Sequence, residues 1–199
     1  MIDQLQQQLG PDTISQLSRQ LGTDENQTRQ ALPLALSALV GGLGREAATP
    51  QGAQNLSGAL DRDHDGSLLD NLGGLLGQSG GGGLGGLGEG ILKHVLGGKR
   101  PQVESQLGQA SGLDAAKMGK LLALLAPIVL AYLGKQKRQR GLDPGGLGEI
   151  LAGERRQAQQ KAQQSGLGGL GGLLDRDGDG DILDDLAGLA GGFLGGGKR

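Results

Sequence analysis

The chain has 199 residues with 43 Gly, one Tyr, one Phe, no Trp and no Cys, and its formal net charge is −2. The lack of Cys excludes disulfides, thiolate catalysis and zinc–thiolate sites. Aromatic side chains bury the largest areas, so a core built here from Leu, Ala, Ile and Val will be small for the length of the chain.

Neither the N-terminal residues nor the most apolar run of the sequence points to a membrane. Residues 1–10 lack a basic region followed by an apolar one, so we expect no secretory signal and a cytoplasmic protein. The most apolar run, Leu121–Leu133, contains Pro127 and is shorter than the roughly 20 residues that a span needs. It predicts a buried helix, with no membrane span.

The first part of the chain carries helix signals. Thr23 or Asp24 can cap a helix, with Gln27 near the capping-box position. The apolar residues that follow recur at helical spacing and predict one buried face, made of Leu32, Leu36, Leu39, Val40 and Leu43. Pro33 should kink or restart this helix, because proline lacks a backbone donor.

The same signals recur later in the chain in the same order. Residues 22–24 match 112–114 after a shift of 90, and residues 33–36 match 127–130 after a shift of 94. In this second copy Asp114 is the expected cap, Pro127 takes the place of Pro33, and the expected face is Leu121, Leu122, Leu125, Ile128, Val129 and Tyr132. The alternative is chance likeness between low-complexity segments, but the shared order favours an internal duplication.

Proline also marks the start of a third helix in each copy. Pro50 follows Thr49, and Pro144 follows Asp143, so that each first-turn proline comes directly after a capping residue. No segment shows the period-two pattern of a strand. We therefore predict an all-α fold of duplicated small helical units, each ending in a helix-loop-helix Asp box and joined by Gly/Leu-rich flexible linkers.

The predicted organisation follows from these signals and from the glycine-rich stretches. Residues 1–78 form the first unit with its Asp box at 61–72, 79–90 a Gly-rich linker, 91–153 the second unit, 154–174 a polar and Gly/Leu linker, and 175–199 the second box and a C-terminal helix. Glycine spacings in 81–90 resemble a dinucleotide-binding loop, but no strand precedes them, which favours a linker.

The two Asp boxes are the strongest motif. Residues 61–66 read Asp-Arg-Asp-His-Asp-Gly, and residues 175–180 read Asp-Arg-Asp-Gly-Asp-Gly. Carboxylates about 4 Å apart repel by roughly 1 kcal/mol in water, and a bound cation removes this repulsion. Oxygen ligands at positions one, three and five with Gly at six open a calcium loop of the EF-hand type. We predict calcium as the bound ion; magnesium is possible but requires tighter geometry.

The predicted metal ligands are Asp61, Asp63, Asp65, Ser67 and Asp70 in the first box, and Asp175, Asp177, Asp179, Asp181 and Asp184 in the second. A full EF-hand loop has a bidentate Glu at position twelve, where this chain has Leu72 and Leu186. Asp70 and Asp184 would have to replace it, so we expect micromolar to millimolar affinity. The alternative is that the boxes are only acidic helix entries, favoured by the helix dipole.

A basic tract is the second candidate binding element, made of Lys135, Lys137, Arg138, Arg140, Arg155, Arg156 and Lys161. It could bind nucleic acid or another anion. It lacks interleaved aromatic residues for base stacking, so a solvated helix end is favoured and nucleic acid is not expected. His64 and His94 are expected to face solvent. No nucleophile–base arrangement is present, so we predict no enzyme, no catalytic residues and no cofactor other than the cation.

Residues 118–136 and 141–147 resemble the YidB-like family of bacterial proteins of unknown function. They read from Met-Gly-Lys through Ala-Pro-Ile-Val-Leu to Gly-Lys-Gln, and then Gly-Leu-Asp-Pro-Gly-Gly-Leu. The resemblance covers most of the chain. It implies a small helical bacterial protein and no known reaction. Separately, the boxes resemble EF-hand and dockerin-like calcium loops at positions one, three, five and six.

The sequence thus predicts a non-enzymatic bacterial helical protein that binds calcium through two incomplete EF-like loops. It would act in protein interaction, with an unknown protein partner or by self-association. The alternative is a nucleic-acid or anion-binding module that uses residues 135–161 and in which the boxes are acidic helix entries.

Overall fold

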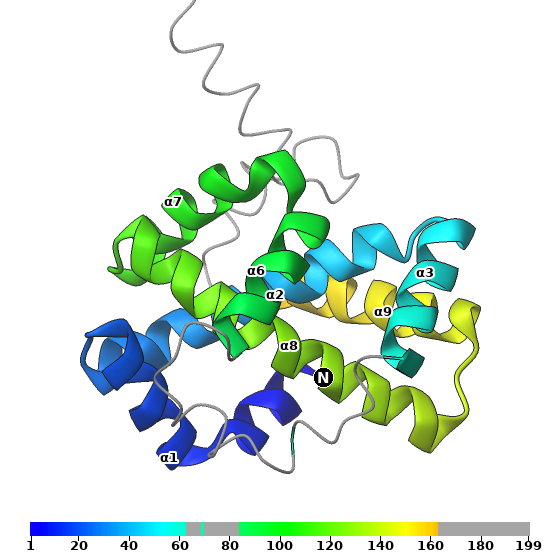
Figure 1. The fold of residues 1–199 in the computed structure, drawn as a ribbon, viewed down its shortest axis with the longest axis horizontal. Coiled ribbons are helices and arrows are strands. Elements are labelled where there is room, and N and C mark those ends of the chain that lie inside the picture. The colour runs from blue at the N-terminus through cyan, green and yellow to red at the C-terminus, as the bar shows by residue number, and fades with distance from the viewer. Residues whose placement is uncertain (63–68, 70–83, 163–199) are drawn as a thin grey trace, which may run out of the picture. The chain divides into compact units, whose positions relative to one another are not determined.

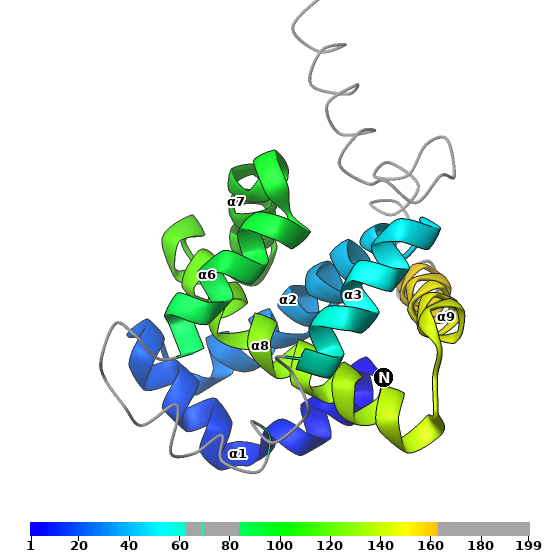
Figure 2. The ribbon, with the colours of Figure 1, turned by 45° about the vertical axis from the view of Figure 1, so that its right-hand side comes forward.

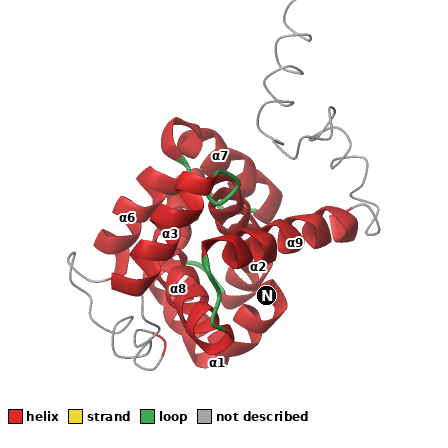
Figure 3. Cartoon of the chain, turned by 90° about the vertical axis from the view of Figure 1, so that its right-hand side faces the viewer, coloured by secondary structure: helices red, strands yellow, loops and turns green. Residues whose placement is uncertain are grey.

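The computed structural model describes residues 1–62, 69 and 84–162. Within these residues the fold is all-α, as predicted, and contains no strand (Figures 1 and 3). The helices are α1 (Ile2–Leu21), α2 (Glu25–Glu46), α3 (Pro50–Arg62), α6 (Leu84–Val95), the short 3-10 helix η1 (Gly97–Lys99), α7 (Arg100–Ser111), α8 (Ala115–Arg140) and α9 (Pro144–Ala162). Residues Met1–Arg155 form one compact unit, and Arg156–Arg199 form a second.

Helix α8 is the centre of the first compact unit. It contacts α1, α2, α3, α6 and α7, which surround it in two different views (Figures 1 and 2). Every residue from Leu121 to Gly134 is buried. The predicted buried helix is confirmed, but the predicted single face is too narrow, because Leu124 and Leu130 outside that face are buried as well. By length and composition α8 could cross a membrane, and 83% of its most apolar window is buried inside the protein.

The N-terminal caps of α2 and α8 follow the prediction. The Asp24 carboxylate accepts from the backbone N–H of Gln27 at 2.9 Å, and the Asp114 carboxylate accepts from that of Lys117 at 2.8 Å. Asp24 is therefore the cap and Thr23 is not. Each cap follows a glycine in the left-handed conformation that ends the preceding helix, at Gly22 and at Gly112.

The caps of α3 and α9 match one another in the same way. The Thr49 hydroxyl accepts from the N–H of Gly52 at 3.0 Å, and the Asp143 carboxylate accepts from the N–H of Gly146 at 2.7 Å. The helices begin at Pro50 and Pro144, as predicted. A capping oxygen followed by a first-turn proline thus starts both helices.

Among the described helices, α1 is the one that contains a residue with non-helical backbone angles. Helices α2 and α8 continue through Pro33 and Pro127, so the predicted restart there is wrong. In each of these helices, burial of the leucines before and after the proline outweighs the one backbone hydrogen bond that the proline cannot make. In α1, Gly10 takes a non-helical conformation (φ 51°, ψ 166°) before Pro11. Glycine tolerates this conformation, and the following proline disfavours helical geometry at the residue before it.

Two segments that were expected to be flexible linkers are partly helical. Residues 84–90 of the expected Gly-rich linker belong to α6, and residues 154–162 of the expected polar linker belong to α9. Glycine weakens α6 as an isolated helix, but packing on α8 stabilises it. The closest approach is at Gly88, where an added Cβ would lie 1.7 Å from the carbonyl oxygen of Ala123.

We predict that Gly88→Ala will lower the free energy of unfolding by about 2–3 kcal/mol, because the new methyl group must push α6 away from α8. Gly90→Ala in the same helix is the matched control, since a Cβ there would meet nothing within 4 Å. It should raise stability by up to about 1 kcal/mol through helix propensity. Urea unfolding of both variants measures this. Equal effects at the two positions would contradict the packing of α6 on α8.

Candidate functional site

Asp61 alone, of the predicted metal ligands, lies within the described residues. It occupies the last turn of α3, and its carboxylate accepts from Lys137 Nζ of α8 at 2.5 Å. Lys137 Nζ also donates to the carbonyl oxygen of Ser57 at 3.3 Å. The other predicted ligands are outside the described part of the chain, and they are Asp63, Asp65, Ser67, Asp70, Asp175, Asp177, Asp179, Asp181 and Asp184.

The described residues hold no group of three or more His, Cys, Asp or Glu side chains that could bind a metal ion. Of the two Asp boxes, the described residues include only Asp61, Arg62 and Leu69. Calcium binding by the boxes therefore stays a prediction.

The basic tract is divided between two helices. Lys135, Lys137, Arg138 and Arg140 lie in the last turns of α8, and Arg155, Arg156 and Lys161 lie in α9. Lys137 is turned towards α3, with its side chain only 11% exposed. One cation of the tract is thus already neutralised by Asp61, a pairing that the sequence analysis did not find.

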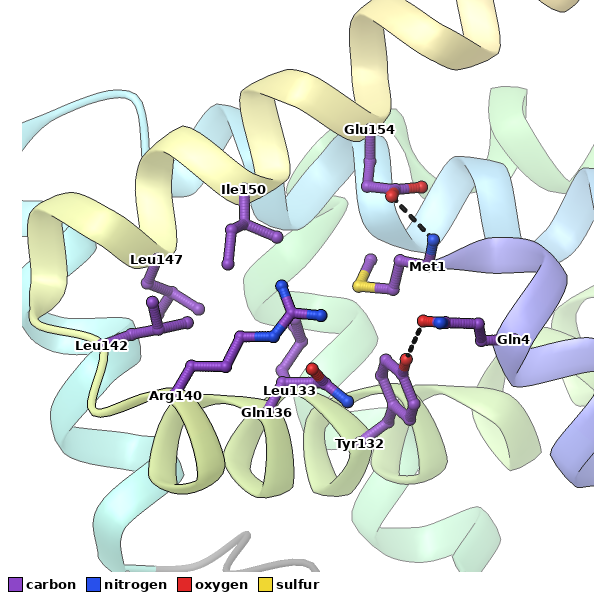
Figure 4. A pocket seen from close by; sticks show the side chains of 10 residues that line it. All are labelled: Met1, Gln4, Tyr132, Leu133, Gln136, Arg140, Leu142, Leu147, Ile150 and Glu154. Atoms are coloured by element: carbon purple, nitrogen blue, oxygen red, sulfur yellow. Dashed lines mark hydrogen bonds and ion pairs between the residues drawn. The ribbon is translucent and has the colours of Figure 1, made fainter.

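Two adjoining hollows lie in the first compact unit, an inner one between α1, α8 and α9 (Figure 4) and an outer one between α1 and α8. The inner one has a volume of about 50 Å³. Its lining consists of Met1, Gln4, Tyr132, Leu133, Gln136, Arg140, Leu142, Leu147, Ile150 and Glu154. The outer one has a volume of about 300 Å³ and is lined by Gln4, Gln7, Gln8, Tyr132 and Gln136. Three residues are shared, so we treat the two together as the amide hollow.

Tyr132 forms the wall between α1 and α8 in the amide hollow. Its hydroxyl donates to Gln4 Oε1 at 2.7 Å. Burial raises the pKa of the Tyr132 phenol; Arg140 acts in the opposite direction, and Glu154 in the same direction as burial. The phenol therefore stays protonated at neutral pH and serves as a donor. Sequence analysis placed Tyr132 in the core but could not connect it with Gln4 at the other end of the chain.

The charged groups of the amide hollow differ in their pairing. The Glu154 carboxylate accepts from the Met1 ammonium at 2.7 Å. Arg140 makes no hydrogen bond or ion pair with another described residue (Figure 4). Its guanidinium reaches into the space between α8 and α9, beside Leu133 and Met1. The hollow therefore combines several neutral amides with one cation that has no partner among the described residues.

A separate charge cluster joins α6 to α7. The Arg100 guanidinium donates to both carboxylate oxygens of Glu89, at 2.5 and 2.9 Å, and to Glu104 at 2.5 Å. These hydrogen bonds raise the pKa of Arg100, with the bond to Glu89 as the largest cause. The hydrogen bond from Arg100 lowers the pKa of Glu89. The cluster therefore favours the charged forms and fixes the corner between the helices.

The fold is that of a small helical protein built around one buried apolar helix. The chain belongs to a family described as "Bacterial protein of unknown function (DUF937)", whose profile matches residues 3–136, more than half of the chain. No curated protein and no solved structure matches it. The bacterial family of unknown function expected from the sequence is thereby shown. The YidB-like resemblance and the EF-like loops stay predictions.

We predict that Glu89→Gln will lower the free energy of unfolding by about 0.5–1 kcal/mol at neutral pH, as for other partly exposed ion pairs. The folded pKa of Glu89 lies below its ordinary value. The stabilisation is therefore fully present above that ordinary value and is lost as the pH falls through the folded pKa.

Urea unfolding of the native protein and of Glu89→Gln between neutral and acid pH measures this difference. Glu149→Gln is the control, because Glu149 is an exposed acid of α9 outside the charge cluster. The difference in unfolding free energy between Glu149→Gln and the native protein should not shrink in the same way as the pH falls. A Glu89→Gln effect of constant size down to acid pH would show that the ion pair with Arg100 does not contribute to stability.

Proposed function

We propose that this bacterial protein is a non-enzymatic calcium-binding protein that acts in protein interaction in the cytoplasm. It would bind the ion through two incomplete EF-like loops that begin at Asp61 and Asp175. The observation that carries the proposal is the repeated pattern of three alternating aspartates followed by glycine. Unbound, these carboxylates repel one another, and a hard cation with oxygen ligands relieves that repulsion.

The position of Asp61 in α3 supports this proposal. Asp61 lies in the last described turn of that helix. In an EF-hand a helix likewise leads into the ligand loop. Asp61 is therefore compatible with position one of such a loop.

We also propose that the chain arose by internal duplication, which would explain why two boxes occur. The caps Asp24 and Asp114 support this, as do the pairs Thr49-Pro50 and Asp143-Pro144, since each pair holds the same position in its copy. Helix α9 would then correspond to α3. Its polar extension through Ala162 accounts for part of the longer spacing before the second box.

Because of Lys137, we expect the two loops to differ in their affinity for calcium. This lysine holds Asp61 in an ion pair, so a cation that uses Asp61 must compete with an ammonium group. The first loop should therefore bind more weakly than it would without this lysine. The nucleic-acid alternative draws on the same residue, and the pairing with Asp61 engages Lys137 in the folded protein.

Thermal unfolding of the full chain with calcium, magnesium or chelator tests the proposal. We predict that calcium will raise the melting temperature, because a ligand of the folded state stabilises it by about 2.7 kcal/mol at one hundred times its dissociation constant. The double variant Asp175→Ala with Asp177→Ala should lose the part of this rise in melting temperature that comes from calcium bound to the second loop. Calorimetry should show the same loss as a reduced number of sites.

The matched control is Asp12→Ala with Glu149→Ala, which removes two exposed acids outside the boxes. It should keep the full calcium response. No heat and no thermal shift at millimolar calcium would refute the proposal. Salt-dependent binding to DNA or RNA, lost when Arg138 and Arg140 are neutralised, would instead support the anion-binding alternative.

We predict that Lys137→Gln will increase calcium affinity at the first loop by about two- to fivefold, the equivalent of 0.5–1 kcal/mol for a partly exposed pair. In chelator the same variant should melt earlier than the native protein, because it loses the link between α3 and α8. Calorimetry with the second loop disabled isolates this effect. Unchanged affinity would show that Asp61 is not a ligand.

A further inference from the structure

The amide hollow has no role in the proposed calcium chemistry, and the inference drawn from it does not depend on that proposal. We propose that the hollow binds the free C-terminal end of a peptide. The carboxylate would pair with Arg140, and the peptide groups would bind the glutamine side chains of α1 and α8.

Arg140 supplies the charge that selects a carboxylate. Its guanidinium reaches into the inner hollow and has no partner among the described residues (Figure 4). The carboxylate opposite, on Glu154, is engaged by the Met1 ammonium at 2.7 Å. A guanidinium matches a carboxylate with two parallel hydrogen bonds. One such cation suits a ligand with a single negative charge.

Glutamine side chains supply the neutral part of the site. Gln4, Gln7, Gln8 and Gln136 line the outer hollow together with Tyr132. Each amide both donates and accepts, as each peptide group of a ligand does. The Tyr132 hydroxyl occupies Gln4 Oε1, which leaves the NH₂ group of Gln4 as its available donor. A lining of this kind favours an uncharged chain of peptide groups behind the carboxylate.

The sizes of the two hollows agree with a carboxylate in the inner hollow and peptide groups in the outer one. The inner hollow, at about 50 Å³, has room for a group as small as a carboxylate. The outer hollow, at about 300 Å³, reaches the lower end of the range for ligand sites. Apolar side chains of α8, α9 and the turn between them, at Leu133, Leu142, Leu147 and Ile150, complete the inner wall. They favour a last residue with a small apolar side chain.

The test titrates Ala-Ala-Ala, as the free acid and as the C-terminal amide, into the isotope-labelled full chain in the presence of chelator. Side-chain NMR signals of the glutamines and of the arginine Nε–H groups report binding. We expect the free acid to bind with a millimolar dissociation constant. The amide should bind about tenfold more weakly, because it lacks the charge-assisted hydrogen bond to Arg140.

Two variants locate the interaction. Arg140→Gln should abolish the preference for the free acid without lowering the melting temperature, because Arg140 has no partner among the described residues. Arg138→Gln is the matched control on the same helix, exposed and outside the lining of the hollow. It should keep the preference.

Three results would overturn the inference. They are equal binding of acid and amide, no binding of the free acid at millimolar concentration, and a preference that survives Arg140→Gln. Acetate that binds as tightly as the tripeptide would show a site for small anions and would remove the peptide from the assignment. If Arg140→Gln does not fold, the comparison of acid with amide on the native protein decides alone.

Discussion

Complete burial of the apolar stretch of α8 is the constraint on which the rest of this structure depends. Leu121–Gly134 is buried on all sides, in a chain with one Tyr, one Phe and no Trp. Leucine and alanine bury less area for each residue than aromatic side chains do, so the cover requires several helices at short distance. Glycine allows the helices to approach this closely at two points, where Gly88 packs against α8 and where Gly42 packs against Val95 of α6. The glycine content therefore serves the core as well as the loops.

Polar ties fix both ends of this central helix. Near its start Lys117 and Lys120 donate to the carbonyl oxygens of Gly22 and Gln20 at the end of α1. These carbonyls lie at the negative end of the α1 dipole, where the two ammonium groups are favourable. Near its end Lys137 reaches Asp61 and Ser57 of α3. The apolar middle gives α8 its burial, and the lysines link its two ends to α1 and α3.

The sequence predicted the features that depend on near neighbours. The caps at Asp24, Asp114, Thr49 and Asp143 involve residues three positions apart, and the buried face of α2 follows helical spacing. The first half of α6, residues 84–90, escaped prediction because its glycines argue against a helix, whereas the contact at Gly88 that stabilises it comes from α8. The amide hollow escaped for a related reason. Tyr132 and Gln4 lie 128 positions apart, and no local pattern joins them.

The two proposed binding elements meet at the last turns of α8. Lys137 reaches the first Asp box through Asp61, and Arg140, three residues later, reaches the amide hollow. A cation that takes Asp61 from Lys137 leaves an additional unpaired positive charge on the turn that carries Arg140. That charge favours a carboxylate in the hollow, and by linkage a bound carboxylate favours the cation to the same extent. Both sites lie near the surface, where salt screens such coupling within about 8–10 Å, so the coupling is expected to be small and to weaken as ionic strength rises.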